Sequence, residues 1–387
     1  WAANPLAGVP VDGSAVLWMP TGAASCQGGF LVGCRFNTIT ARAAGTVTVG
    51  DATYNIPAGA PVDCAVGGRR ATLTSARLFD DLRAGWAYEI QFTGVNYTVG
   101  AMITSKEVPV GSPGVFFPRV RIYGTGATRP TIETTAAISA VWSDCFSYYV
   151  EDLMFLDTGG ATGVFLGRCQ ISAFRNLRVD GFGVFQVGVA GTKNLLYRIE
   201  TVNGSFIGTG TNFEALALDC YQSAAPAGTT GISLNASTLM YVIAANNTGA
   251  GSNGVDLGIG RGAALHVTAY NNAADGFAVS PAGRGILMVG SLSTNNGNDG
   301  VQADFTDQSV NGHIFNNNAF FSNAGLNYNN APAGANDTTG VNPGYINPGA
   351  LNWGLGSALV NLGWPPSSLV AGISSLTNTF TEPGAAQ

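Results

Sequence analysis

Apolar and small or polar residues alternate along much of the chain in short runs with a period of two. This period is typical of a β-strand with one buried face, because successive side chains of a strand point to opposite sides. In the run GVDLGI we expect Val255, Leu257 and Ile259 to face a core, and Asp256 and Gly258 to face outward. The pattern therefore predicts an all-β protein.

The strands recur at a regular spacing between about residues 239 and 330. A glycine followed by an apolar residue occurs at Gly254, Gly276 and Gly300, which are 22 and 24 residues apart, and again at Gly325 after a further 25. Repeats of this length indicate a solenoid, in which each unit buries its apolar face by stacking on its neighbours. Strand chemistry in a solenoid predicts a parallel β-helix.

Paired asparagines come just before the polar turn of three successive units: Asn246-Asn247, Asn271-Asn272 and Asn295-Asn296. Asparagines stacked at matching corners can hydrogen-bond along a ladder, and they tolerate left-handed backbone. We therefore expect an asparagine ladder. The alternative is an Asn-rich surface without a common register.

The stretch from about residue 115 to 365, with these Gly-apolar corners and Asn doublets, resembles the right-handed parallel β-helix superfamily typified by pectate lyases and bacteriophage tailspikes. The resemblance implies a single-stranded right-handed solenoid and an extracellular or virion-surface location. Because spikes of this superfamily are commonly trimers, it also implies a homotrimer. It implies no particular reaction.

Residues 1–110 do not follow the repeat and predict a small N-terminal β-rich domain with one short helix over Arg77–Trp86. The end of this helix, Leu82-Arg83-Ala84-Gly85-Trp86, resembles small β-modules of phage structural proteins. We expect the β-helix to occupy residues 111–365. Residues 366–387 are expected to form a C-terminal tail that caps the solenoid or packs on a partner chain.

Composition narrows the function classes. Charged residues are 10% of the chain and the net charge is −6, without a basic run, which argues against nucleic acid as a partner. No apolar run reaches the 18 residues of a spanning helix, so membrane insertion is not expected. Six cysteines without a CxxC pair and only two histidines give no metal motif, and we expect no cofactor.

Acidic candidates lie near the outward column that follows each Gly-apolar corner. That column is expected to hold Ser233, Asp256, Ala278, Gln302 and Asn327. Asp304 belongs to the next outward column, and Asp299 and Asp307 lie in flanking turns. Together with Asp256 they are catalytic candidates for a glycosidase-like acid and base, which require two nearby carboxyl groups. The alternative is that these aspartates cap turns.

Basic candidates begin two successive units. Arg261 opens RGAAL and Arg284 opens RGILM, so we expect them to stack and to bind an acidic sugar or carboxylates of a neighbouring subunit. Lys193 and Arg198 are further candidates for lyase chemistry. A solvated rim is the alternative for all of them.

Four ring side chains complete the ligand or interface candidates. Phe165 and Phe185 follow Gly163-Val164 and Gly183-Val184, so with the valines inward we expect two phenylalanines stacked on the outside. His266 is expected to face outward beside Tyr241 of the previous unit, as a surface or interface residue.

Three functions fit these features. The first is a surface-exposed structural or receptor-binding protein of a virion, such as a capsid decoration, fibre or tailspike-like component, with other virion proteins or cell-surface polysaccharide as partners. The second is a secreted polysaccharide lyase or glycoside hydrolase, and the third is a bacterial cell-surface or matrix protein. The sequence contains no Ser-His-Asp set or phosphate loop, so it favours a non-enzymatic role and leaves catalysis open.

Overall fold

A computed structural model describes residues 15–20, 34–43, 46–49, 52–55, 65–68, 87–93, 96–104, 119–143, 147–166, 171–186, 192–208, 214–258, 261–280, 285–303, 312–331, 333–334 and 336–343. The chain divides into two units, residues 1–86 with 108–118, and residues 87–107 with 119–387.

The first unit contains an antiparallel sheet with the strand order β4-β3-β2-β1-β5. Its strands are β1 (Ala15–Pro20), β2 (Cys34–Ala43), β3 (Thr46–Val49), β4 (Ala52–Asn55) and β5 (Ala65–Gly68). In the hairpin of β3 and β4, Val47 pairs with Tyr54. The helix predicted over Arg77–Trp86 lies outside the described residues.

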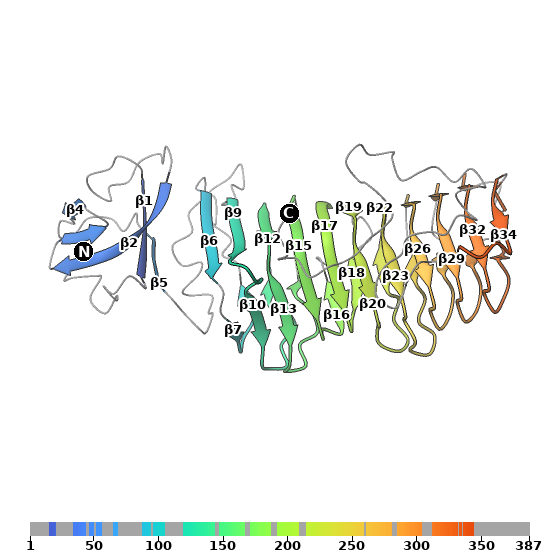
Figure 1. Ribbon diagram of the computed structural model, residues 1–387, viewed down its shortest axis with the longest axis horizontal. Helices are drawn as coiled ribbons and strands as arrows, with labels where there is room; N and C mark the ends of the chain where they lie inside the picture. Colours follow the sequence, from blue (N-terminus) through green and yellow to red (C-terminus); the bar gives the residue numbers. More distant parts are fainter. Residues whose placement is uncertain are drawn as a thin grey trace, which may run out of the picture. The chain divides into compact units, whose positions relative to one another are not determined.

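The second unit is a β-solenoid in which successive coils stack along one axis (Figure 1). We call the strands of each coil its first, second and third strands. The first strands are β6 (Ala87–Thr93), β9 (Arg119–Thr125), β12 (Tyr148–Glu151), β19 (Glu214–Leu218), β22 (Thr238–Met240), β25 (Ala263–Leu265), β28 (Leu287–Val289) and β31 (Ile314–Asn316). The second strands are β7 (Asn96–Val99), β10 (Thr131–Thr134), β13 (Met154–Asp157), β20 (Tyr221–Ser223), β23 (Ile243–Ala245), β26 (Thr268–Tyr270), β29 (Leu292–Thr294), β32 (Ala319–Phe321) and β34 (Thr338–Thr339).

Two strands run through both positions of their coils, β15 (Ala173–Asp180) and β17 (Thr192–Val202). The third strands are β8 (Ile103–Thr104), β11 (Trp142–Ser143) and β14 (Phe165–Leu166), followed by β16 (Val184–Gln186), β18 (Ser205–Gly208), β21 (Ile232–Leu234), β24 (Val255–Asp256), β27 (Phe277–Val279), β30 (Val301–Ala303) and β33 (Tyr328–Asn329).

All strand pairs between described coils are parallel, with partners one coil apart in the sequence. Val255, for example, pairs with Ile232 below it and Phe277 above it. The parallel β-helix is therefore confirmed.

The solenoid begins earlier in the chain than residue 111. Ala87 of β6 pairs in parallel with Arg119, and Asn96 of β7 pairs with Thr131, which are spacings of 32 and 35 residues. These first coils are longer than the 22 to 25 residues of the repeat, so their periodicity is not visible in the sequence. The boundary expected at residue 365 and the tail from 366 to 387 lie outside the described residues.

The core consists of inward columns that run from coil to coil. The inward column of the first strands is almost fully buried and contains Val150, Phe174, Leu196, Ala217, Leu239, Ala264, Met288 and Phe315. In the run GVDLGI, Val255 and Leu257 are buried and Asp256 is half-buried, as predicted. Ile259 lies outside the described residues.

The corner between the first and second strands is a single residue with left-handed backbone in every coil from β12 onward. Its φ angles lie between 53° and 61° at Asp152, Asn176, Arg198, Asp219, Tyr241, His266, Gly290 and Asn317. Non-glycine residues adopt this backbone at a cost of about 1–2 kcal/mol. Hydrogen bonds between coils offset the cost, as where the His266 amide donates to the Val289 carbonyl at 3.0 Å.

The next corner holds the asparagine doublets, and it confirms the ladder. The first asparagine of each doublet has left-handed φ, and the second points into the core. Asn247 Nδ2 donates to Asn272 Oδ1 at 2.8 Å, Asn272 Nδ2 to Asn296 Oδ1 at 2.9 Å, and Asn296 Nδ2 to Asn323 Oδ1 at 2.9 Å. Each buried amide thus donates a hydrogen bond to the side-chain oxygen of the asparagine in the next coil. These hydrogen bonds offset the cost of removing the polar side chains from water.

Candidate functional site

Asp256 lies on the outward side of β24, as expected, and is half-buried. The amide of Gly258 donates to its Oδ1 at 2.7 Å, and the Ser233 hydroxyl lies 3.5 Å from its Oδ2. Burial raises the pKa of Asp256, and these two hydrogen bonds partly oppose the rise. Asp304 and Asp307 lie outside the described residues, so the expected acidic cluster is described only at Asp256 and Asp299.

Asp299 is a buried turn residue whose two carboxylate oxygens bond within the chain. Its Oδ1 accepts the Leu326 amide at 2.7 Å, and its Oδ2 accepts Asn329 Nδ2 at 2.8 Å. Asp275 accepts the Asp299 amide in the same way one coil below, at 3.0 Å. Asp299 therefore belongs to a column of turn-capping side chains.

The outward column of Asp256 is as predicted except at its end. Asp256 pairs with Ser233 and Ala278, and Ala278 with Gln302. Gln302 then pairs with Asn329 rather than Asn327, because the last described coil has two more residues than its Gly-Leu pair suggests.

The prediction that Phe165 faces outward is wrong. Phe165 pairs with Trp142, both are fully buried, and its ring centroid is 4.7 Å from that of Phe174. Gly163-Val164 resembles the later Gly-apolar corners, but the strand that follows is offset by one residue relative to the strands of the later coils. Such an offset moves a side chain to the opposite face of the strand.

The same slip affects Phe185. Its backbone pairs with Phe206, which is fully buried and continues the inward column to Ile232 and Val255. Val184 therefore takes the place that glycine holds in later coils. The backbone register does not favour the outward stack, which stays a prediction for Phe185 because its side chain lies outside the described part of the chain.

Arg261 is exposed and precedes β25. Because Ala263 pairs with Leu287, the residue in register with Arg261 is Gly285 and not Arg284. Arg284 itself lies outside the described residues. The stacked arginine pair thus stays a prediction that the strand register does not favour.

His266 and Tyr241 lie side by side at the left-handed corner, as predicted. Their rings are stacked, with centroids 5.2 Å apart and an interplanar angle of 8°. Burial lowers the pKa of His266 and raises that of Tyr241. The stacked rings therefore form a packing arrangement.

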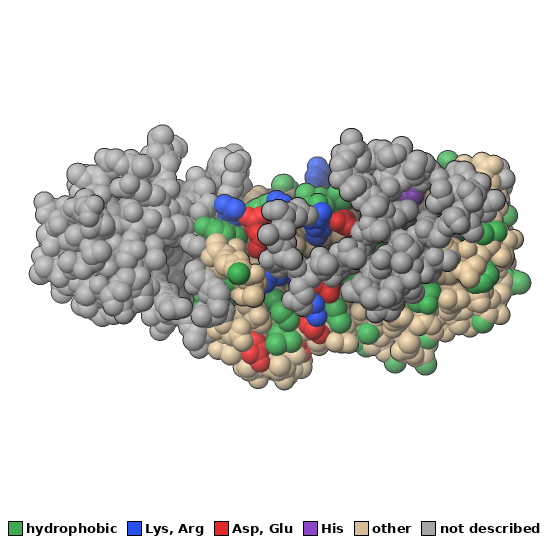
Figure 2. Space-filling model, in the orientation of Figure 1, with side chains coloured by type: hydrophobic (Ala, Val, Ile, Leu, Met, Phe, Trp, Pro, Cys, Tyr) green, Lys and Arg blue, Asp and Glu red, His purple; other side chains and the backbone are tan. Residues whose placement is uncertain are grey.

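A cluster of arginine and tyrosine side chains that the sequence reading missed lies on the outward side of the early first strands. We call it the arginine–tyrosine face, and it comprises Arg121, Tyr123, Tyr149, Arg175, Tyr197 and Arg198, with Glu151 beneath them. Figure 2 shows acidic and basic side chains gathered over these coils. The side chains of Arg121 and Arg198 are 44% and 45% exposed, and the three tyrosines are half-buried.

Each guanidinium of this face lies against a tyrosine ring. Arg121 lies 4.4 Å from the ring centroid of Tyr123, and Arg175 and Arg198 lie 5.8 and 5.2 Å from that of Tyr197. A hydrogen bond with the Tyr149 side chain raises the pKa of Arg175. These contacts hold the flexible arginines in place beside the rings.

Two carboxylates each position one of these guanidiniums. Glu151, which is buried, accepts Arg121 Nε at 2.9 Å. Asp219 accepts Arg198 Nε at 3.1 Å. Burial raises the pKa of Asp219, and its bond with Arg198 opposes this rise.

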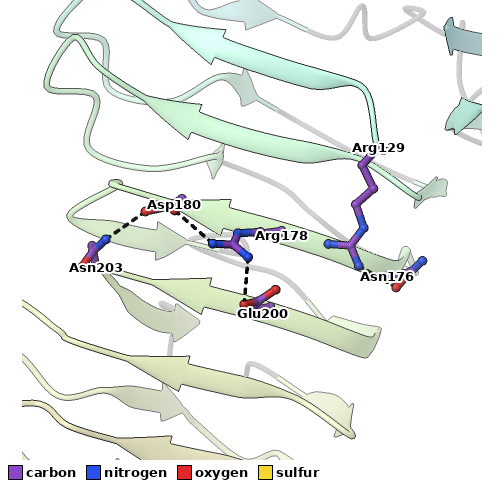
Figure 3. A network of polar contacts seen from close by, with 6 residues as sticks. All are labelled: Arg129, Asn176, Arg178, Asp180, Glu200 and Asn203. Carbon is purple, nitrogen blue, oxygen red and sulfur yellow. Dashed lines mark hydrogen bonds and ion pairs between the residues drawn. The ribbon is translucent and has the colours of Figure 1, made fainter. Parts of the chain in front are cut away.

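A second network lies on the neighbouring second-strand half of β15 and β17 (Figure 3). Arg178 contacts Asp180 at 3.5 Å and Glu200 at 3.3 Å. Asn203 Nδ2 donates to Asp180 Oδ1 at 3.0 Å, and at the corner Arg129 Nη2 donates to Asn176 Oδ1 at 2.8 Å. The network links successive coils and borders the arginine–tyrosine face.

One sequence signal could have found this site. Of the charged residues, 17 lie between Arg119 and Asp219, against nine in the 168 residues that follow Asp219. The sequence alone does not show that these residues cluster on one face, because the pairing register of β9, β12, β15 and β17 brings them together. Of the lyase candidates, Arg198 belongs to the face, and Lys193 is an exposed residue near the start of β17.

Other site types find no support in the described part of the chain. No group of three or more His, Cys, Asp or Glu side chains there is placed to hold a metal ion. No described helix is long and apolar enough to cross a membrane.

No family model and no curated protein matches the chain. Among solved structures it is similar to the A-module of Azotobacter vinelandii mannuronan C-5 epimerase AlgE4, at 12% identity and a TM-score of 0.39, over 66% of this chain and 89% of that one. It is also similar to the ORF18 protein of Geobacillus virus E2, at 10% identity and a TM-score of 0.29, over 63% of this chain and 54% of that one. Tailspike protein 3 of bacteriophage CBA120 is similar at 12% identity and a TM-score of 0.30, over 66% of this chain and 56% of that one.

This chain thus spans little more than half the length of the two viral proteins. At these identities and TM-scores the similarities transfer no residue and no activity. The strand pairing carries the structural conclusion: the second unit of this chain is a parallel β-helix.

Proposed function

We propose that this chain is a surface-exposed β-helix protein that binds a polysaccharide through the arginine–tyrosine face. A half-exposed tyrosine offers an apolar ring face and a hydroxyl, and an arginine offers five hydrogen-bond donors. Tyrosine rings next to arginine hydrogen-bond donors suit a ligand that has both apolar faces and many oxygen acceptors. A sugar has this chemistry.

The charges of the face support a glycan rather than a nucleic acid. Three arginines stand against two carboxylates, Glu151 and Asp219, so the face has a net charge of only +1 and lacks the cluster of positive charge that phosphate neutralisation needs. The four strands β9, β12, β15 and β17 span about 15 Å along the axis at the usual strand spacing. This length fits several linked sugars.

The setting we propose is a virion surface, where such a protein binds a receptor polysaccharide as a fibre or tailspike-like component. The extracellular location and the homotrimer belong to this proposal. The exposed apolar side chains Ile171 (57%) and Leu326 (60%) support a contact with another chain. Native mass spectrometry tests the trimer directly, and a monomer at micromolar concentration contradicts it.

Binding to a polysaccharide array tests the function. A glycan bound by the wild-type chain is then titrated against Tyr197→Ala and Arg175→Gln, which we expect to weaken binding about tenfold or more. Gln302→Ala, which truncates a partly exposed side chain on a third strand, is the matched control and should bind like the wild type. Unchanged affinity in both face variants contradicts the proposal.

The second candidate function is a polysaccharide lyase or glycoside hydrolase. The observation that favours it is that burial raises the pKa of Asp256 and of Asp219, as in carboxyl groups that act as general acids. Release of reducing ends or unsaturated uronates from a polysaccharide panel tests it. An activity that survives in both Asp256→Asn and Asp219→Asn excludes these two carboxyl groups.

A further inference from the structure

Arg175 occupies the middle of the arginine–tyrosine face. It lies on β15, the strand between β12 and β17, and it is exposed. The other two guanidiniums of the face are each paired with a carboxylate, Arg121 with Glu151 and Arg198 with Asp219. Arg175 forms no ion pair with any side chain that the structure describes. The one positive charge that the face has in excess is therefore the charge of Arg175.

Two acidic residues whose charge reaches Arg175 are bonded to other groups. Arg121 donates from Nε and from Nη2 to Glu151 Oε1, at 2.9 and 2.5 Å. Asp152 Oδ1 accepts Asn176 Nδ2 at 2.5 Å. Neither carboxylate therefore occupies the donors of Arg175. A guanidinium has five N–H donors, so Arg175 retains donors for a group from outside the chain.

Two tyrosines hold the Arg175 guanidinium in place. It forms a hydrogen bond with the Tyr149 side chain, and it lies 5.8 Å from the centroid of the Tyr197 ring. A guanidinium that is already held loses less freedom when it binds a ligand. Its planar fork matches the two oxygens of a carboxylate, which accept two parallel hydrogen bonds. The site is thus preorganised for a planar anion.

Apolar side chains border this guanidinium on the same outward side of the sheet. The outward column two residues before it runs from Tyr149 through Ala173 to Leu195. Ala173 is half-buried, and Leu195 is 40% exposed. Because the Ala173 side chain ends at Cβ, no large side chain of this column stands beside Arg175 on its own strand. A ligand at Arg175 therefore meets a single charge next to apolar surface.

We propose that the glycan bound by the arginine–tyrosine face is acidic, and that Arg175 binds the carboxylate of one of its sugars. This assignment rests on the proposed function, because it names the ligand class of the same face. A sugar acid combines a planar anion with the apolar faces of its ring. The anion matches the guanidinium, and the ring matches Tyr149, Tyr197 and Leu195. One unpaired guanidinium binds one carboxylate, so a single acidic sugar in the bound stretch is sufficient.

Glycans with and without their carboxylates test the ligand class. Hyaluronan, polygalacturonate and polysialic acid are each presented beside a carboxyl-reduced form, in which the carboxylates are primary alcohols. The wild-type chain should bind at least one acidic form about tenfold or more tightly than its reduced form, because the reduced form lacks the charge-assisted pair. In Arg175→Gln this difference should disappear. Arg261→Gln removes the same charge from an exposed position on a later coil, and it should keep the wild-type difference.

The same titrations separate this assignment from the proposed function. Tyr197→Ala should weaken the binding of both forms, since the contact of a sugar with the ring does not depend on the carboxylate. Equal affinity of the wild type for the acidic and reduced forms overturns the assignment, and a loss in Tyr197→Ala then leaves the proposed function standing. Unchanged affinity of Tyr197→Ala and Arg175→Gln for both forms overturns the two together. Binding of dextran sulfate without binding of any carboxylated glycan overturns the carboxylate.

A lysine at the same position tests the contact with both oxygens. Arg175→Lys keeps the charge but replaces the planar fork with an ammonium group. We expect it to recover only part of the difference between the acidic and reduced forms. A difference as large as that of the wild type overturns the contact of the guanidinium fork with two oxygens.

Discussion

Single asparagines in this chain hold either a corner or a core position, depending on where they stand in their doublet. Asn271 has left-handed φ and is exposed, whereas Asn272 is 2% exposed and bonded above and below. The two residues have the same side chain, so the backbone position decides the role. The first asparagine tolerates the left-handed backbone of the corner, and the second forms hydrogen bonds with the buried amides of the adjacent coils.

Replacing Asn272 with leucine tests the buried role. Asn272→Leu keeps the number and branching of the side-chain heavy atoms but leaves polar groups of the adjacent ladder amides unpaired, so we expect the free energy of unfolding to fall by about 2–4 kcal/mol. Chemical denaturation measures it. Asn271→Gly keeps the left-handed backbone and removes an exposed side chain whose hydrogen bond, from its Nδ2 to Asn246 Oδ1 at 2.9 Å, is also exposed, so it should cost less than about 1 kcal/mol. Similar losses in the two variants contradict the ladder as a stabilising element.

At the scale of elements, the corner between first and second strands allows short strands to wind into coils. The residues differ at each step of this column, yet the φ angle stays nearly constant from Asp152 to Asn317. At Gly290 the constraint is also steric, because an added Cβ would lie 2.8 Å from the His266 ring. That ring in turn stacks on Tyr241, so moving it away from an added Cβ would disturb the stacking.

Two alanine substitutions in this column separate strain from crowding. Both Asn317→Ala and Gly290→Ala introduce alanine at a left-handed position, which costs about 1–2 kcal/mol. Gly290→Ala also collides with His266, so its loss in unfolding free energy should be larger, by about 1–3 kcal/mol. In a His266→Ala background this excess should disappear. An excess that persists there shows that the imidazole is not the obstacle.

At the scale of the whole chain, the two units use charge differently from an average protein. Only 10% of residues are charged, and the polar groups on the outer surface of the described coils are mainly uncharged. Two of the described carboxyl groups lie among poorly hydrated neighbours. Asp219 and Asp256 show the effect, since burial raises the pKa of each.

The raised pKa values predict how stability varies with pH. A carboxyl group whose pKa is higher in the folded state binds protons more readily there, so its contribution to stability decreases as pH rises above its ordinary value near 4. Asp256→Asn should therefore raise the thermal midpoint at pH 7, and the gain should shrink towards pH 4. Gln302→Ala serves as a control without a titrating group. A gain that is the same at both pH values contradicts the desolvation of Asp256.

The strand period and the repeat length were sufficient to predict the β-helix, the asparagine ladder, the outward position of Asp256 and the contact of His266 with Tyr241. These features depend on local alternation and on a nearly constant spacing of coils, and both can be read along the chain. The repeat was regular where these predictions succeeded.

The folded chain decided the features that depend on register between unequal coils. Phe165 is inward because its coil is offset by one residue, and the arginine–tyrosine face forms because β9, β12, β15 and β17 align residues spaced by 22 to 28 positions. A loop that lengthens or shortens one coil shifts which side chains become neighbours, and no local pattern records that shift.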